Sequence, residues 1–88
     1  MGYGIAFRPA ARHALDTQLP ESVAVACVEF IFGPLADNPY RVGKPLRAPL
    51  EGVHSARRGE FRVLYTVDDG AVTVLVVGIQ HRRDAYWT

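Results

Sequence analysis

The sequence predicts an α+β fold in which a helical hairpin covers one face of a four-stranded sheet. Three observations support this class: an alternating apolar segment near the N-terminus, two helix-forming segments separated by a proline, and three β-rich segments separated by tight-turn residues. The helical segments are consecutive, and so are the last three strands, so the two kinds of element are segregated along the chain. The predicted order is an N-terminal strand, a helical hairpin and a three-stranded antiparallel meander.

The first half of the chain supplies one strand and both helices. Residues 3–8 alternate large apolar and small side chains, which is typical of a strand. Pro9 fits the first turn of a helix, and residues 10–18 continue it with an apolar row along one side. Pro20 ends this helix and starts a second one over residues 21–35. Apolar residues surround most of this second helix, so we expect it to be covered on more than one side.

The second half supplies a basic loop and three strands. Residues 39–49 follow a turn signal and are expected to form an ordered loop rich in cations. Strands are predicted over residues 52–57, 61–67 and 71–79. Alternation in the middle strand turns four side chains toward the helices, namely Phe61, Val63, Tyr65 and Val67. Arg62 therefore lies on the opposite, open face of the sheet.

Composition and charge indicate a small globular domain with a local basic surface. The 88 residues fit one domain spanning 1–88, and a hydrophobic content of 49% excludes a disordered chain. The net charge is only +1, but six cations lie between residues 41 and 62, where Glu51 and Glu60 are the only acids. Nine of the ten cations are arginines, whose planar side chain suits bidentate contact with phosphate. This distribution predicts a local anionic partner rather than general adhesion to nucleic acid.

Several classes of protein are excluded by what the sequence lacks. The single cysteine, Cys27, cannot form an internal disulfide, which fits a reducing cytoplasm. The first residues lack the apolar core of a signal peptide, and the longest apolar run, 23–32, is broken by Glu29 and too short to span a bilayer. No metal-site spacing links the potential soft ligands His13, Cys27, His54 and His81. We therefore expect a cytoplasmic protein without a membrane segment, metal or cofactor.

The candidate site is a hairpin that carries several arginines. An arginine inside a strand of Phe, Val, Leu and Tyr costs stability unless the protein uses it. Arg62, with Arg57 or Arg58 on the neighbouring strand, resembles a clamp for phosphate. Clustered arginines also stabilise the charge of a phosphoryl-transfer transition state without a metal. His81 and Tyr86 follow the last strand and are candidates for proton transfer and hydrogen bonding near neutral pH.

Each of these candidates also has a purely structural interpretation. Arg62 could pair with an acidic neighbour at the edge of the sheet. His81 could be an exposed loop histidine, and Tyr86 could dock the end of the chain on the sheet. Arg82 and Arg83 could be solvated charges.

Four segments of the chain together resemble the RelE/ParE superfamily of bacterial toxins, and the RelE branch is the closer match. They cover residues 41–46, 50–52, 55–65 and 77–86. The most specific parts are Gly59-Glu60-Phe61-Arg62-Val63-Leu64-Tyr65 and His81-Arg82-Arg83-Asp84-Ala85-Tyr86. The resemblance extends over nearly the whole chain and agrees with the order of elements predicted above.

The resemblance implies the toxin of a type II toxin–antitoxin system that acts as a ribosome-dependent endoribonuclease on mRNA. In this chemistry the ribose 2′-hydroxyl attacks the adjacent phosphate and the 5′-oxygen leaves, without a metal. The positions that match the family's catalytic residues are Arg57, Arg62, His81 and Tyr86. Contacts to ribosomal or messenger RNA would come from Lys44, Arg47, Arg58, Arg82 and Arg83. The implied partners are the ribosome with its mRNA and a cognate antitoxin that is partly disordered and folds on binding.

The chain departs from the family pattern at a few positions. Some relatives carry lysines where it has His54 and Ser55, and some carry an arginine where it has Gln80. These departures leave the route of proton transfer open and give His81 more weight as the titratable group. The ParE branch shares the fold but targets DNA gyrase, so a gyrase-inhibiting toxin without nuclease activity is the alternative, and a degenerate member that only binds a partner is a third. The terminal pattern from His81 to Tyr86 favours RNA cleavage.

Overall fold

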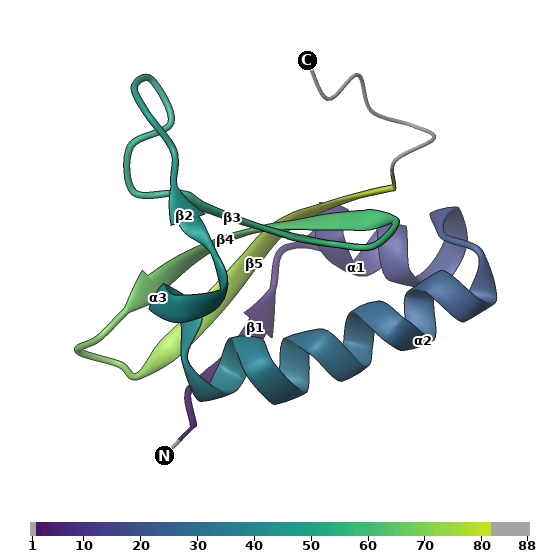
Figure 1. Ribbon diagram of the computed structural model, residues 1–88, viewed down its shortest axis with the longest axis horizontal. Helices are drawn as coiled ribbons and strands as arrows, with labels where there is room; N and C mark the ends of the chain where they lie inside the picture. Colours follow the sequence, from purple (N-terminus) through teal and green to yellow (C-terminus); the bar gives the residue numbers. More distant parts are fainter. Residues whose placement is uncertain (1, 82–88) are drawn as a thin grey trace.

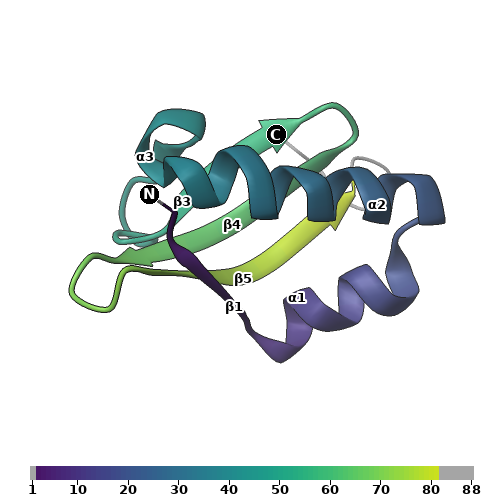
Figure 2. The ribbon, with the colours of Figure 1, turned by 90° about the horizontal axis from the view of Figure 1, so that it is seen from below.

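The structure, a computed structural model, describes residues 2–81. In these residues, helical segments lie on one face of a five-stranded sheet (Figures 1 and 2). The elements in chain order are β1 (Gly4–Phe7), α1 (Pro9–His13), the π-helical segment η1 (Ala14–Gln18), α2 (Glu21–Phe30), the π-helical segment η2 (Ile31–Leu35), α3 (Pro39–Val42), β2 (Lys44–Pro45), β3 (His54–Arg58), β4 (Phe61–Asp68) and β5 (Thr73–His81). The α+β class, the helical hairpin and the meander are confirmed.

The sheet has the strand order β1-β5-β4-β3-β2. Strands β3, β4 and β5 form the predicted antiparallel meander, while β1 runs parallel to β5 at one edge. The fifth strand, β2, was not predicted, because its two residues are too few to show an alternating pattern. Its Pro45 suits an edge strand, since proline has no N–H to donate to a neighbour.

Each arm of the helical hairpin begins as an α-helix and continues as a π-helical segment. Pro9 occupies the first turn of α1, where its missing N–H costs nothing. In η1 the Leu19 amide donates to the Ala14 carbonyl five residues earlier, at 3.0 Å. Pro34 lies inside η2, where its ring would crowd the carbonyl four residues earlier in a regular α-helix, and a wider π-helical turn relieves that crowding. Pro9 thus opens the hairpin as predicted, whereas the π-helical turn around Pro34 was not predicted.

The core lies between the sheet and α2. Phe61, Val63 and Tyr65 of β4 are buried, as their alternation predicted, and the helices contribute further side chains, namely Val23, Cys27, Phe30, Ile31 and Leu35. The expectation that the second helix is covered on more than one side was wrong for the described residues. Val25 and Phe32 of this helix and its extension are 53% and 57% exposed. This leaves an apolar strip on the surface.

Residues 39–49, predicted as a loop, contain the short helix α3 and then β2. Pro39 starts α3 at its first turn. Figure 1 shows α3 at the β2 edge of the sheet, where the chain continues from α3 into β2.

No helix among residues 2–81 has both the length and the apolar character needed to cross a membrane.

Candidate functional site

Arg57 of β3 and Arg62 of β4 are direct partners across the antiparallel ladder. Cross-strand partners project from the same face, and here it is the face opposite Phe61, Val63 and the helices. In the described part of the chain, no helix covers this face (Figure 1). Like charges at directly opposed positions destabilise a sheet. An anion placed over the two guanidinium groups would be attracted by both of them.

These two arginines line a hollow of about 600 Å³ beside β2. The other wall is the chain from Val42 to Arg47, and Ser55 lies between the walls. Among residues 2–81, the lining includes four cations, namely Lys44, Arg47, Arg57 and Arg62, and no acidic residue. We call this feature the basic hollow. Its charge and its position on an open sheet face suit a polyanion more than a small neutral ligand.

Sheet register places each cation of the basic hollow. Lys44 pairs with Ser55, which lies two residues before Arg57 and therefore on the same face. Arg47 begins the tight turn in which the Leu50 amide donates to its carbonyl at 2.9 Å. Arg62 also pairs with Gln80 of β5, so a polar row runs across three strands. Ser55 and Gln80 were not predicted as site residues. Counting two positions back from Arg57 would have found Ser55, whereas Gln80 depends on the register between β4 and β5.

Two of the predicted site residues lie on the other face. Arg58 and His81 belong to one row with Phe61 between them, one position away from the row of Arg57, Arg62 and Gln80. Since alternate residues of a strand point to opposite faces, this row is turned toward the helices. Arg58 and His81 therefore do not share the face of Arg62, contrary to their prediction as members of one site with it.

The local contacts agree with that placement. The Arg58 guanidinium lies 4.7 Å from the centre of the Phe30 ring. His81 ends β5, which extends two residues further than predicted, and it is only 3% exposed. Its Nε2 lies 3.5 Å from Oε1 of Glu60. Arg82, Arg83 and Tyr86 lie outside the described residues.

A second cluster fixes α3 to the rest of the fold. The hydroxyls of Tyr3 and Tyr40 donate to the two oxygens of Asp69, at 2.7 and 2.6 Å. These hydrogen bonds hold the pKa of Asp69 below its ordinary value and raise the pKa of Tyr40 to about 12. Tyr40 also contacts the edge of His54, which stacks on Tyr65. The segment that leads into β2 is thus held by contacts on several sides.

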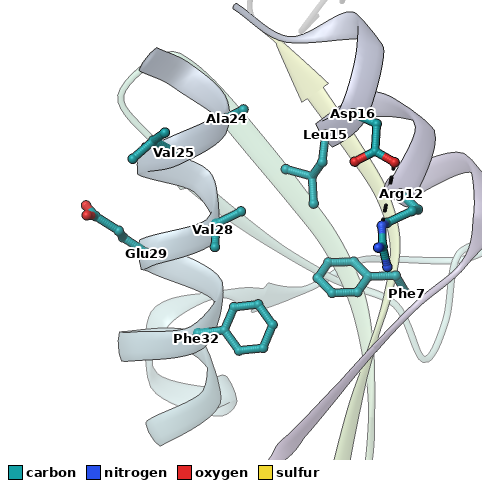
Figure 3. Close-up of a pocket in the computed structure, with 9 residues that line it drawn as sticks. All are labelled: Phe7, Arg12, Leu15, Asp16, Ala24, Val25, Val28, Glu29 and Phe32. Atoms are coloured by element: carbon teal, nitrogen blue, oxygen red, sulfur yellow. Dashed lines mark ion pairs between the residues drawn. The ribbon is translucent and has the colours of Figure 1, made fainter. Parts of the chain in front are cut away.

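An apolar groove of about 490 Å³ lies between the two arms of the helical hairpin, on the opposite side of the molecule from the basic hollow. Figure 3 shows Val28 and Phe32 facing Phe7 and Leu15 across it, while Glu29 points away. Phe7 and Phe32 are in ring contact, with centroids 6.1 Å apart. Groups of three or more potential metal ligands are absent from residues 2–81. The described residues thus include a basic surface and, apart from it, an apolar one.

Comparisons with known proteins point to one family. The model of the family described as "ParE toxin of type II toxin-antitoxin system, parDE" matches residues 5–86. Toxin RelE of Mycobacterium tuberculosis is 52% identical over 84 residues, covering 96% of this chain and 86% of that protein. Toxin RelG of the same organism is 48% identical over 86 residues, covering 98% of each.

Solved structures agree with the sequence comparisons. A chain of the M. tuberculosis toxin–antitoxin complex RelBE2 is 46% identical and superposes with a TM-score of 0.90, covering 96% of this chain and 95% of that one. The isolated E. coli RelE toxin has a TM-score of 0.74 at 17% identity, covering 96% of this chain and 88% of that one, which shows a shared fold.

Proposed function

The chain belongs to the ParE toxin family of type II toxin–antitoxin systems and is RelE-like within it, and we propose that it acts as an endoribonuclease on messenger RNA at the ribosome. The observation that carries this proposal is the basic hollow, in which the opposed pair Arg57 and Arg62 meets Lys44 and Arg47 and to which the described residues add no acid. The RelE and RelG names of the M. tuberculosis relatives support the RelE branch.

The basic hollow suits an RNA backbone on electrostatic grounds. Lysine and arginine contacts to phosphate displace counterions, which gives affinity without sequence preference. Arginine adds short, charge-assisted hydrogen bonds to phosphate oxygens. Lys44 and Arg47 on one wall and Arg57 and Arg62 on the other would hold successive phosphates of a single strand. The substrate in this proposal is ribosome-bound mRNA in the cytoplasm.

The proposed chemistry transfers the phosphate from the 5′-oxygen to the 2′-oxygen of the neighbouring ribose. The 2′-oxygen loses its proton and bonds to phosphorus, the bond from phosphorus to the 5′-oxygen breaks, and that oxygen gains a proton. Arg62 and Arg57 would stabilise the extra negative charge on the phosphate oxygens in the transition state. Both remain cationic at neutral pH, so they supply charge rather than a base.

Proton transfer requires another group. His81 was the first candidate, but its side chain is buried on the helix-facing side, away from the face of Arg57 and Arg62. We therefore assign proton transfer to Tyr86, which lies outside the described residues, and give His81 no direct role. The test compares how the cleavage rate depends on pH in the wild type and in His81→Gln. The same pH profile in both proteins would support this assignment, and a variant that loses the acid or the alkaline limb of the profile would refute it.

A cognate antitoxin is the proposed protein partner. The M. tuberculosis RelBE2 neighbour is a toxin–antitoxin complex, and so is the E. coli RelBE neighbour. The apolar groove offers the surface, because Val28 and Phe32 are 39% and 57% exposed there. An amphipathic segment that is disordered alone and folds on binding would bury these side chains.

The family model that matches is named for ParE, which favours a second candidate function. A ParE-like toxin would bind DNA gyrase and cleave no RNA. Primer extension on ribosome-bound message after expression of the chain separates the two functions. Cuts within codons support the endoribonuclease, whereas intact message together with inhibited gyrase supercoiling would favour the gyrase inhibitor.

The decisive variant is Arg62→Ala, with Arg8→Ala as its matched control. Arg8 is an exposed arginine at the start of α1, remote from the basic hollow. Loss of one stabilising donor at a transition-state oxyanion typically slows catalysis by about 10²–10³-fold. We expect Arg62→Ala to relieve growth arrest and message cleavage, and Arg8→Ala to remain toxic. Full toxicity of a folded Arg62→Ala protein would contradict the proposed site.

A further inference from the structure

The chain passes directly over the hydroxyl of Tyr65 at Gly43. A Cβ atom added to Gly43 would overlap the Tyr65 hydroxyl oxygen and would lie 2.9 Å from the carbonyl oxygen of Ser55. The backbone of Gly43 is extended, with φ −135°, so any residue could adopt its conformation. Glycine is needed here for space and not for its dihedral freedom.

Tyr65 holds the same segment from the other end of α3. Its side chain is completely buried, and its hydroxyl donates a hydrogen bond to the carbonyl oxygen of Pro39 at 2.6 Å. Pro39 starts α3 and Gly43 follows its end. One hydroxyl therefore contacts the helix at its beginning and the chain where it leaves the helix.

The residues that follow Gly43 form one wall of the basic hollow. Lys44 pairs with Ser55, and the Leu46 amide donates to the Val53 carbonyl at 2.9 Å. Since Gly43 directly precedes Lys44, any displacement at Gly43 moves this edge strand relative to Arg57 and Arg62. The distance between the two cationic walls depends on how closely the chain approaches Tyr65.

We propose that Gly43 and Tyr65 are positioning residues, which set Lys44 and Arg47 at the separation from Arg57 and Arg62 that an RNA backbone requires. The inference rests on the proposed function, because it assigns RNA to the basic hollow. Neither residue touches RNA in this proposal. Tyr65 would then do more than fill the core, since its hydroxyl and not only its ring would matter for binding.

The test compares Gly43→Ala with Tyr65→Phe, with the double variant and with Gly33→Ala as a matched control. Gly33 has nothing within 4 Å of an added Cβ, so the same substitution there is sterically harmless. Two measurements are made on each protein. Fluorescence anisotropy with a labelled single-stranded RNA oligonucleotide, at several salt concentrations, reports RNA affinity. Amide hydrogen exchange at Leu46 reports whether β2 remains paired.

We expect Gly43→Ala to weaken RNA binding by about tenfold and to lower the slope of log affinity against log salt by about 1, as for one lost phosphate contact. Leu46 should lose protection in the same protein. The double variant should recover part of the RNA affinity and part of the protection at Leu46. The Tyr65→Phe change removes the overlapping hydroxyl, while the close contact with the Ser55 carbonyl remains. A change in packing alone would lower stability without changing the salt slope.

The inference is overturned if Gly43→Ala shows the same RNA affinity and the same protection at Leu46 as the control Gly33→Ala. If Gly43→Ala loses protection at Leu46 but binds RNA with unchanged affinity, the inference is also overturned. In that case the position of β2 would not affect RNA binding. A double variant no better than Gly43→Ala would refute the role of the Tyr65 hydroxyl. If the wild-type protein fails to bind the oligonucleotide, the inference is overturned, because the basic hollow then does not hold free RNA. The proposed function is decided separately, by primer extension on ribosome-bound message.

Discussion

Arg57 and Arg62 face each other across the β3–β4 ladder, on the side of the sheet that no described helix covers. Two cations at directly opposed positions repel, so the sheet would be more stable with a neutral residue at one of them. A polyanion lying over the pair would interact favourably with both side chains. The opposed charges therefore lower the stability of the free sheet and raise its affinity for an anion.

Replacing Arg57 with threonine should stabilise the free protein and weaken its RNA binding. Threonine suits a strand, and its introduction removes the like charge opposite Arg62, which costs about 0.5 kcal/mol. Urea denaturation at low and high salt measures the free energy of unfolding. The gain should be larger at low salt, because salt screens exposed charges. A loss of stability at low salt would show that Arg57 is held by contacts that outweigh the repulsion.

The four cations of the basic hollow should contribute separately to RNA affinity. Lys44→Ala and Arg47→Ala should each lower the slope of log affinity against log salt by about 1. Arg58→Ala is the matched control, because Arg58 packs on Phe30 on the other face. It should leave the slope unchanged and cost about 0.5–1 kcal/mol of stability. An Arg58 variant that loses affinity as the others do would mean that RNA reaches the helix-facing side.

The strand alternation of the sequence was sufficient to predict which face of the sheet the side chains of β4 occupy. It placed Phe61, Val63 and Tyr65 in the core and Arg62 on the open face, and the structure confirms both. It also placed His81 wrongly, because no pattern in the sequence indicates that β5 continues as far as this residue. That extension turns His81 toward the helices.

Contacts between distant segments could not be predicted in the same way. The pairing of Lys44 with Ser55 involves only two residues of β2, which carry no periodic signal. The close approach of Gly43 to Tyr65 depends on the path of the chain through α3. Such contacts can be identified only from the three-dimensional structure, because neither residue type nor spacing specifies them.

The apolar groove should bind the antitoxin without contributing much to the stability of the toxin. Phe32 is 57% exposed, so Phe32→Ser removes little buried surface and should change the free energy of unfolding by about 0.5 kcal/mol or less. The same change should weaken binding of the cognate antitoxin, measured by calorimetry, because it removes an aromatic side chain from the groove in Figure 3. Leu50→Ser is the control, since Leu50 is similarly exposed, at 52%, and lies outside the groove. Equal antitoxin affinity in the two variants would place the antitoxin elsewhere.

The cluster of Tyr3, Tyr40 and Asp69 should make stability fall at both acidic and alkaline pH. The pKa of Asp69 is lowered from its ordinary value of 3.8, first by the hydrogen bond from Tyr40 and then by that from Tyr3. The unfolded chain therefore binds this proton more tightly than the native protein does. The contribution of Asp69 is complete above about pH 5 and is lost as the pH falls through its native pKa.

The tyrosines act in the opposite direction. The pKa of Tyr40 rises from 10.0 to about 12, mainly through its hydrogen bond to Asp69, and burial raises the pKa of Tyr65 from 10.0 to about 12 as well. Their contribution is complete below about pH 10 and is lost as the pH rises toward about 12.

The variant Asp69→Asn tests both limbs of this profile. Urea denaturation across the pH range should show a flatter acid limb in the variant, because residue 69 no longer titrates. The alkaline limb should become shallower but should persist, since Tyr65 is unaffected by the change. Absorbance of tyrosinate should show Tyr40 titrating closer to its ordinary pKa of 10.0 in the variant, while the buried Tyr65 still titrates late. An unchanged acid limb would show that Asp69 carries no part of the pH dependence, and its bonds to Tyr3 and Tyr40 would then not hold α3 in solution.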